Sequence, residues 1–396
     1  MTATTITSQL RAGVSILHEL AFKSDADVYD LLILASAWAA LWAVFFFFAT
    51  PVLRNMTYGK PWLYNRFKRE LSHYGGWKVV NDKYGFDFTC EDDFVGYMMR
   101  GWAEQQIINV QHLFGGALCI PSLLGLGDPT WASSLAVLGI LCEVGWEMQD
   151  MIKCVYSRLR HGVKRVPTVM IIIRLVHHSL TSVLGIPVIL HYREWWVIHS
   201  LCFDLQFGTT VVEPLGEYGK VMDITKPDEL RLFKIINIIK VIVCVWTRGI
   251  HFVYLVVLAL IGWYNDKAWV FLIVGSPLLL AFTGYNCYCE LYPVIKTYLK
   301  FRNATAEYEA LPKDASEKQK RESRANLENI ARELLEEAEN IDPTEQLTAL
   351  FESLQESEGK IGRRKTMPPM RKLKSMRSMR LTRRGVSAPA GEWKLD

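Results

Sequence analysis

Residues 31–53 read LLILASAWAALWAVFFFFATPVL, an apolar stretch without a charged side chain. A helix that crosses the hydrocarbon core of a membrane needs about 20 such residues. The stretch therefore predicts a transmembrane helix, and it sets the fold class of the chain. The bulk composition agrees, because half of the 396 residues are apolar and the mean hydropathy is +0.11.

Hydropathy predicts six further spans beyond this stretch. The seven intervals are 31–53, 105–126, 130–152, 167–190, 195–215, 233–263 and 269–298. We therefore expect an all-α polytopic membrane helix bundle with seven transmembrane helices. The eight cysteines form no zinc-type pairs, and most lie inside the apolar stretches. They predict small buried side chains rather than disulfides or metal ligands.

The basic residues of the connections alternate along the chain. Connections 54–103, 153–166 and 216–232 hold eight, five and three Lys or Arg, whereas turns 127–129, 191–194 and 264–268 hold none, one and one. Cytosolic loops carry the excess of Lys and Arg. We therefore expect a lumenal N-terminus and a cytosolic C-terminal tail. No cleavable signal peptide is expected in the first twenty residues.

This topology predicts that two glycosylation sequons stay unmodified. Asn55-Met56-Thr57 and Asn303-Ala304-Thr305 both fall on the predicted cytosolic side. Glycan transfer occurs on the opposite side, so neither asparagine should carry a sugar. Electrophoretic mobility before and after glycosidase treatment checks this. A glycosidase-sensitive shift that disappears in Asn303→Gln would overturn the topology.

Composition divides the chain into five segments. We expect a non-cytosolic segment at 1–30, a first span with a basic cytosolic loop at 31–94, and a six-helix core at 95–300. An acidic amphipathic helical segment follows at 301–358, and a basic disordered segment at 359–396. The basic segment is a candidate ligand for anionic lipid or for a calmodulin-like protein. No nucleic-acid partner is expected.

The fourth predicted span, PTVMIIIRLVHHSLTSVLGIPVIL at 167–190, carries ionisable groups near its middle. Arg174, His177 and His178 lie within about one helical turn, and Thr181 follows His177 on the same face. Ionisable side chains in hydrocarbon are costly, so they indicate a protein interior or a water-filled cavity. This cluster is the candidate functional site.

Asp204 and Arg248 lie near the middle of the fifth and sixth spans. Arg248 needs a partner at this depth. Asp204 is a candidate partner for Arg248, and equally for a histidine of the fourth span. In the second pairing the carboxylate would fix the imidazole tautomer of a general base. The alternative is a buried ion-pair network that only orients helices.

Other polar residues of the spans have simpler interpretations. Glu143, Glu147 and Asp150 lie toward the cytosolic end of the third span, where pairing with Arg or Lys at the surface is favoured. His112 fits a hydrogen-bonded core histidine, and His199 is close enough to the end of the fifth span to reach interfacial water. Metal chemistry is not expected, because His177-His178 is the one close pair among nine histidines and no HExxH motif occurs. No cofactor is expected either.

The polar residues resemble the signature of the TLC-domain family, which includes the ceramide synthases. His177-His178-Ser179-Leu180-Thr181 is similar to the His-His-x-x-Thr sequence of its enzymes. Ceramide synthases then carry His-Asp-x-x-Asp, and His199 and Asp204 fall on the next span, with Ser200 at the place of the first Asp and Asp204 one residue after the place of the second. Arg248 matches an arginine of the penultimate span. The resemblance covers roughly residues 95–300.

The resemblance implies a fold of one span followed by a six-helix TLC core, in the endoplasmic reticulum membrane. It implies sphingolipid metabolism, with an N-acyltransferase that joins fatty acyl-CoA to a long-chain amine such as a sphingoid base. His177, His178 and Asp204 would be catalytic, and Arg248, Thr181, His199 and Arg174 would support them. Basic residues of the third connection are weak candidates for binding the CoA phosphates: Arg158, Arg160, Lys164 and Arg165.

Two other functions remain open at this point. One is a non-catalytic protein of the same fold that binds, senses or regulates membrane lipids. The other is a seven-helix receptor, although no Asp-Arg-Tyr follows the third span and no Asn-Pro-x-x-Tyr lies in the seventh. Besides membrane lipids, a second copy of the chain in a homodimer is an expected partner.

Overall fold

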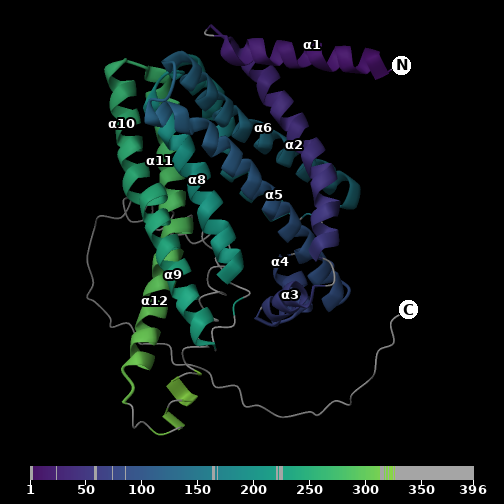
Figure 1. The fold of residues 1–396 in the computed structure, drawn as a ribbon, viewed down its shortest axis with the longest axis vertical. Helices are drawn as coiled ribbons and strands as arrows, with labels where there is room; N and C mark the ends of the chain where they lie inside the picture. Colours follow the sequence, from purple (N-terminus) through teal and green to yellow (C-terminus); the bar gives the residue numbers. More distant parts are fainter. Residues whose placement is uncertain are drawn as a thin grey trace, which may run out of the picture. The chain divides into compact units, whose positions relative to one another are not determined.

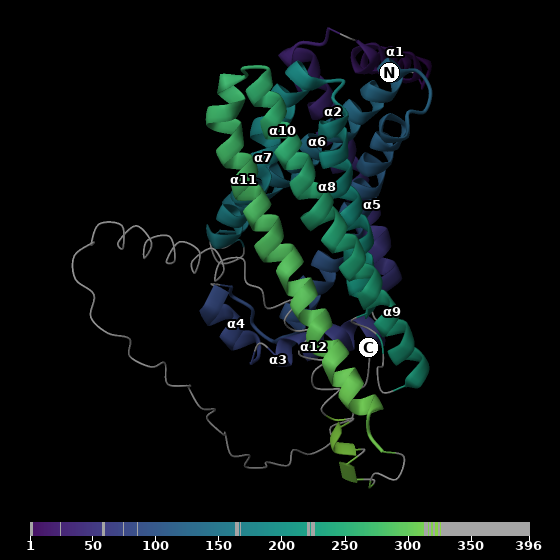
Figure 2. The same ribbon diagram turned by 90° about the vertical axis from the view of Figure 1, so that its left-hand side faces the viewer.

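The computed structural model describes residues 3–325 except 24, 58–59, 74, 85, 163–165, 167, 220–221, 223–225, 313–315, 317, 320 and 324. The described residues are helical, without a strand. The predicted acidic helices beyond residue 325 and the basic segment lie outside the described residues. Figures 1 and 2 show the helices from two directions.

Long helices lie over all seven predicted intervals. They are α2 (Val28–Thr57), α5 (Glu91–Leu124), α6 (Pro129–His161), α7 (Thr168–Tyr192), α8 (Trp196–Gly219), the continuous series α9 (Pro227–Cys244), η1 (Val245–Ile250) and α10 (His251–Asn265), and the series η2 (Phe271–Gly275), α11 (Ser276–Tyr285), η3 (Asn286–Leu291) and α12 (Tyr292–Glu309). The segments labelled η are π-helical turns.

Four helical segments are long and apolar enough to cross a membrane. They are Val28–Thr57, Glu91–Leu124, Asp228–Asn265 and Phe271–Glu307. Large apolar side chains also cover their outer faces; Phe47 and Ile273, for example, are 73% and 71% exposed. Exposed apolar surface of this kind indicates contact with lipid. These four helices indicate that the chain is a membrane protein. That α6, α7 and α8 also cross the membrane stays a prediction.

Local sequence explains the tight turn between α5 and α6. Gly125 ends α5 in the left-handed conformation, with φ 62°, and its N–H donates to the last turn. Glycine adopts this conformation without steric cost. Asp128 then caps α6 by accepting a hydrogen bond from the N–H of Trp131, at 3.0 Å, and Pro129 occupies the first helical position.

Three helices outside the predicted spans were not expected. Helix α1 (Ala3–Phe22) lies in the segment before the first span, and it crosses the end of α2 (Figure 1). Helices α3 (Pro61–His73) and α4 (Trp77–Tyr84) replace much of the predicted loop at 54–103. Their buried side chains, among them Leu63, Phe67 and Val80, pack on the first turns of α5. This apolar periodicity among many charges is what makes them helical.

The main core lies where α5, α6, α7, α8 and α10 meet. Helix α5 packs along both α6 and α8, and α2 packs on α6. Salt bridges tie the peripheral helices to this core. Arg66 of α3 forms a bidentate ion pair with Glu217 of α8, which holds α3 and α4 against the end of the bundle opposite to α1 (Figure 2).

Candidate functional site

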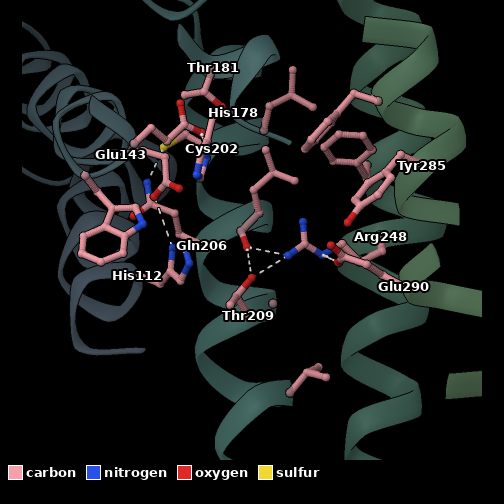
Figure 3. A pocket seen from close by; sticks show the side chains of 18 of the residues that line it. His112, Glu143, His178, Thr181, Cys202, Gln206, Thr209, Arg248, Tyr285 and Glu290 are labelled. Atoms are coloured by element: carbon pink, nitrogen blue, oxygen red, sulfur yellow. Dashed lines mark hydrogen bonds and ion pairs between the residues drawn. The ribbon is translucent and has the colours of Figure 1, made fainter. Parts of the chain in front are cut away.

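A cavity of about 600 Å³ lies between α5–α8 on one side and α9–α12 on the other. This volume falls within the usual range of small-molecule sites, about 300–1,000 Å³. Figure 3 shows polar side chains that point into it from both sides. The cavity combines apolar walls with a few ionisable groups, which is typical of a site for an amphipathic ligand.

One stripe of α8 lines the cavity from end to end. Its residues recur every three or four positions and change from apolar to polar, in the order Ile198, Leu201, Leu205, Thr209, Glu213 and Glu217. At 1.5 Å per residue the stripe is about 28 Å long. The cavity is therefore elongated along the helix, with an apolar part toward the start of α8 and a polar part toward its end.

His178 of α7 lies in the cavity wall between two carboxylates of α6. Its Nε2 is 3.2 Å from Oδ2 of Asp150, and its Nδ1 is 3.5 Å from Oε1 of Glu147. Arg174 donates from Nη1 to the other oxygen of Asp150, at 2.8 Å. Glu147 and His178 are buried, with 3% and 8% exposure. Asp150 thus has its charge balanced by Arg174 while it orients the imidazole.

A second polar pair lines the same side of the cavity. Nδ1 of His112 in α5 is 3.2 Å from Oε2 of Glu143 in α6. Gln111 donates from Nε2 to the same carboxylate oxygen, at 2.8 Å. Glu143 and Glu147 stand one helical turn apart on α6, so the α5–α7 side of the cavity is acidic. We call the four residues His112, Glu143, Glu147 and His178 the acidic pole.

Arg248 lines the opposite side of the cavity. Its Nε lies 2.9 Å from Oε2 of Glu290 in η3. Its Nη2 donates to the backbone carbonyl of Leu205 and to Oγ1 of Thr209, both in α8, at 2.9 and 2.6 Å. Figure 3 shows this group facing the acidic pole across the cavity. Arg248 therefore lies in a part of the cavity wall that is separate from the acidic pole.

The predicted partner of Asp204 is corrected by the structure. Asp204 bonds through Oδ2 to Nδ1 of His251 in α10, at 2.7 Å, and among the side chains that the structure describes it bonds to neither Arg248 nor His178. His251 in turn stacks on Trp246, with ring centroids 5.1 Å apart. The reason is the rotation of α8, which turns Asp204 toward α10 and away from the cavity stripe. A catalytic role for Asp204 therefore lacks geometric support among the residues that line the cavity.

His199 lies outside the cavity wall as well. It is fully buried at the start of α8, where Nδ1 is 2.6 Å from Oγ of Ser122 and Nε2 is 2.8 Å from the carbonyl oxygen of Arg193. Both ring nitrogens thus join α8 to α5 and to the turn before α8. His199 is a packing residue in this arrangement, and it does not reach interfacial water as expected.

The remaining predicted residues divide between the cavity and the surface. Thr181 and Arg174 line the cavity. Arg158 donates to the carbonyl of Val166, and Arg160 donates to the hydroxyl of Tyr156, so both bond near their own connection. Other candidates cannot be placed: Lys164, Arg165 and the side chain of His177 lie outside the described residues.

Sequence reasoning assigned the carboxylates of α6 to the surface, whereas Glu147 and Asp150 are buried beside His178. The sequence does contain a signal for this burial. Glu143, Glu147 and Asp150 are spaced four and then three residues apart, so they share one helical face inside an otherwise apolar stretch. Such a stripe faces a cavity or a neighbouring polar helix. Among the described residues, no three His, Cys, Asp or Glu side chains are arranged so that they could hold a metal ion.

Comparisons of the chain with protein-family models, with curated proteins and with solved structures find no match. The chemistry of the cavity is therefore the basis for a function.

Proposed function

We propose that the cavity is the reaction site of a membrane N-acyltransferase, which transfers a fatty acyl group from acyl-CoA to a long-chain amine. The proposal places seven spans in the endoplasmic reticulum membrane, with α6, α7 and α8 among them and the tail in the cytosol. The resemblance to the TLC-domain family supports this assignment. The observation that carries it is His178 in the cavity wall, held by Asp150 at 3.2 Å.

His178 has the surroundings of a general base. The carboxylate of Asp150, itself neutralised by Arg174, accepts the Nε2–H and so leaves Nδ1 to exchange a proton on the side of Glu147. In the proposed step the amine, bound as an ammonium, first gives one proton to a carboxylate of the cavity wall, and its neutral nitrogen then attacks the carbonyl carbon of the thioester. A C–N bond forms, the C–S bond breaks, the imidazole takes the proton from nitrogen, and that proton returns to the leaving thiolate.

The cavity has one part that suits the charge of a long-chain amine and another that suits its hydrocarbon chain. The acidic pole attracts a positively charged amine, because Glu143 and Glu147 both line it. The apolar stripe of α8 and the facing side chains Phe252 and Phe282 supply a wall for hydrocarbon. Long-chain amines therefore match the site better than small polar amines do.

A test uses the purified full-length protein with radiolabelled sphinganine and a panel of acyl-CoA chain lengths. The expected result is a labelled amide that requires both substrates. Absence of amide with every chain length would contradict the acyltransferase.

A second function, non-catalytic lipid binding, is favoured by one observation. Asp204 and His199, the expected companions of the histidine pair, bond elsewhere and do not line the cavity. His178 would then be one member of a buried ion-pair network with Glu147, Asp150 and Arg174. This protein would bind sphinganine or fatty acid without forming amide, so equilibrium binding beside the activity assay separates the two functions.

A further inference from the structure

Arg248 is a buried cation of the cavity wall, and it lies on the side opposite to the acidic pole (Figure 3). It lies in the π-helical turn η1, and the residue is only 6% exposed. The facing segment η3 is a π-helical turn too, and it supplies Glu290. Single π-helical turns inside helices occur often at functional sites, because the widened turn displaces a side chain from the regular helical position.

The donors of this guanidinium are only partly used. A guanidinium carries five N–H groups: one at Nε and two each at Nη1 and Nη2. Nε lies against Glu290, and Nη2 donates to the carbonyl of Leu205 and to Thr209. Among the described residues, no acceptor contacts Nη1. In Figure 3 the corresponding nitrogen points away from Thr209 and Glu290, toward the interior of the cavity.

The two N–H groups of Nη1 are therefore available to a ligand in the cavity that Arg248 lines. A planar guanidinium suits carbonyl and carboxylate oxygens. Leu205, Phe252 and Phe282 line the cavity next to this position, so an apolar chain attached to the oxygen-bearing carbon has a wall to lie on. An anionic or carbonyl oxygen is also repelled by the carboxylates of the acidic pole, which favours the opposite side of the cavity, where Arg248 lies.

We propose that Arg248 binds the acyl oxygen of a long-chain ligand, as the carboxylate of a fatty acid or the carbonyl of a fatty acyl thioester, through its Nη1 amino group. The cavity then sorts its ligands by charge, with amines at the acidic pole and acyl oxygens at Arg248. The choice of an acyl ligand rests on the proposed acyltransferase function, but the binding itself does not require turnover.

The rival role for Arg248 is purely structural, because it joins α8, η1 and η3. The test therefore measures equilibrium binding of radiolabelled oleate and of radiolabelled oleylamine to the full-length protein in detergent. We expect Arg248→Gln to weaken oleate binding by about tenfold or more, the loss of one charge-assisted hydrogen bond, and to leave oleylamine binding unchanged. Equal weakening of both ligands, or of neither, would overturn the proposal.

A matched control removes the charge of an arginine that lies outside the cavity. Arg193 is a partly buried arginine that donates to the carbonyl of Ala21 and to Ser134, and it does not line the cavity. Arg193→Gln is expected to keep the oleate affinity of the wild type. If Arg248→Gln does not fold, the wild type alone decides: it should prefer oleate to oleyl alcohol by about tenfold, and equal affinity would overturn the proposal.

A further arm distinguishes the two sources of the acyl oxygen. Oleoyl-CoA is compared with its thioether analogue, which lacks the carbonyl oxygen. If Arg248 holds the thioester carbonyl, the wild type binds the analogue more weakly than oleoyl-CoA, whereas Arg248→Gln binds the two equally. If Arg248→Gln weakens the binding of oleate alone, the ligand is the free acid. Oleate binding that depends on Arg248 without any amide formation would refute the acyltransferase and keep this inference. If amide forms and Arg248→Gln does not change oleate binding, the acyltransferase is kept and this inference is refuted.

Discussion

Replacing His178 with glutamine is expected to lower the rate of amide formation by about a thousandfold, the middle of the range for loss of a general base. Glutamine keeps polarity at the position, but it cannot take a proton. The rate constant of amide formation from saturating sphinganine and acyl-CoA measures the effect. Oleylamine binding should persist, because Glu143 and Glu147 remain in the acidic pole.

Asp150→Asn extends this prediction to the group that orients the base. Asparagine leaves Arg174 without its ion-pair partner and gives the imidazole no charged acceptor at Nε2. We expect a loss of about a hundredfold or more, as for other carboxylates that fix a catalytic tautomer. His191→Gln is the matched control, since this histidine lies on the same helix, is exposed and does not line the cavity. Wild-type rates in His178→Gln would reject the proposed base.

Apolar runs placed the long helices well, and for a physical reason. A stretch such as 31–53 has no charged side chain, and lipid offers no hydrogen-bond partner to a backbone outside a helix, so its length and composition favour one structure in a membrane. The same argument covers Glu91–Leu124, Asp228–Asn265 and Phe271–Glu307. Helices α3 and α4 were missed because they are short and rich in charge, and their stability comes from packing on α5.

Partners across helices could not be predicted in this way. The pairing of Asp204 with His251 depends on how α8 is rotated against α10, and hydropathy says nothing about that rotation. Arg248 was expected to need a partner and has one, but Glu290, which lies inside the seventh predicted span, was not considered as that partner. The π-helical turns η1 and η3, which bring the two together, leave no mark in the hydrophobic pattern.

The acidic pole shows which features of a site can be predicted from the sequence. The pair His177-His178 predicted a polar site on this helix, since an ionisable side chain inside an apolar run is costly unless it faces a cavity or a polar partner, and His178 does line the cavity. The identity of its carboxylates was within reach, because Glu143, Glu147 and Asp150 share a face. Their burial depended on α7 packing beside that face of α6 and supplying His178 and Arg174, which is a property of the assembled bundle.

The same bundle depends on one close approach of helices, at Gly145 of α6. A Cβ atom added there would lie 2.6 Å from the carbonyl oxygen of Ala35, 2.9 Å from the backbone nitrogen of Ala39 and 2.5 Å from Cβ of Trp38, all in α2. These atoms belong to the backbone or are fixed to it, so no side-chain rotation can relieve the overlap. Small residues that let helix backbones approach are typical of packing inside membranes.

Gly145→Ala is therefore expected to destabilise the protein by about 1–3 kcal/mol, the usual cost of overpacking, although alanine favours a helix more than glycine does. The midpoint of unfolding by sodium dodecyl sulfate in mixed micelles, with tryptophan fluorescence as the signal, measures this. Gly284→Ala in α11 is the control, because nothing lies within 4 Å of an added Cβ there. That variant should unfold at the same denaturant concentration as the wild type or a higher one. Equal midpoints for the two variants would show that α2 and α6 do not approach each other as closely as the structure has them.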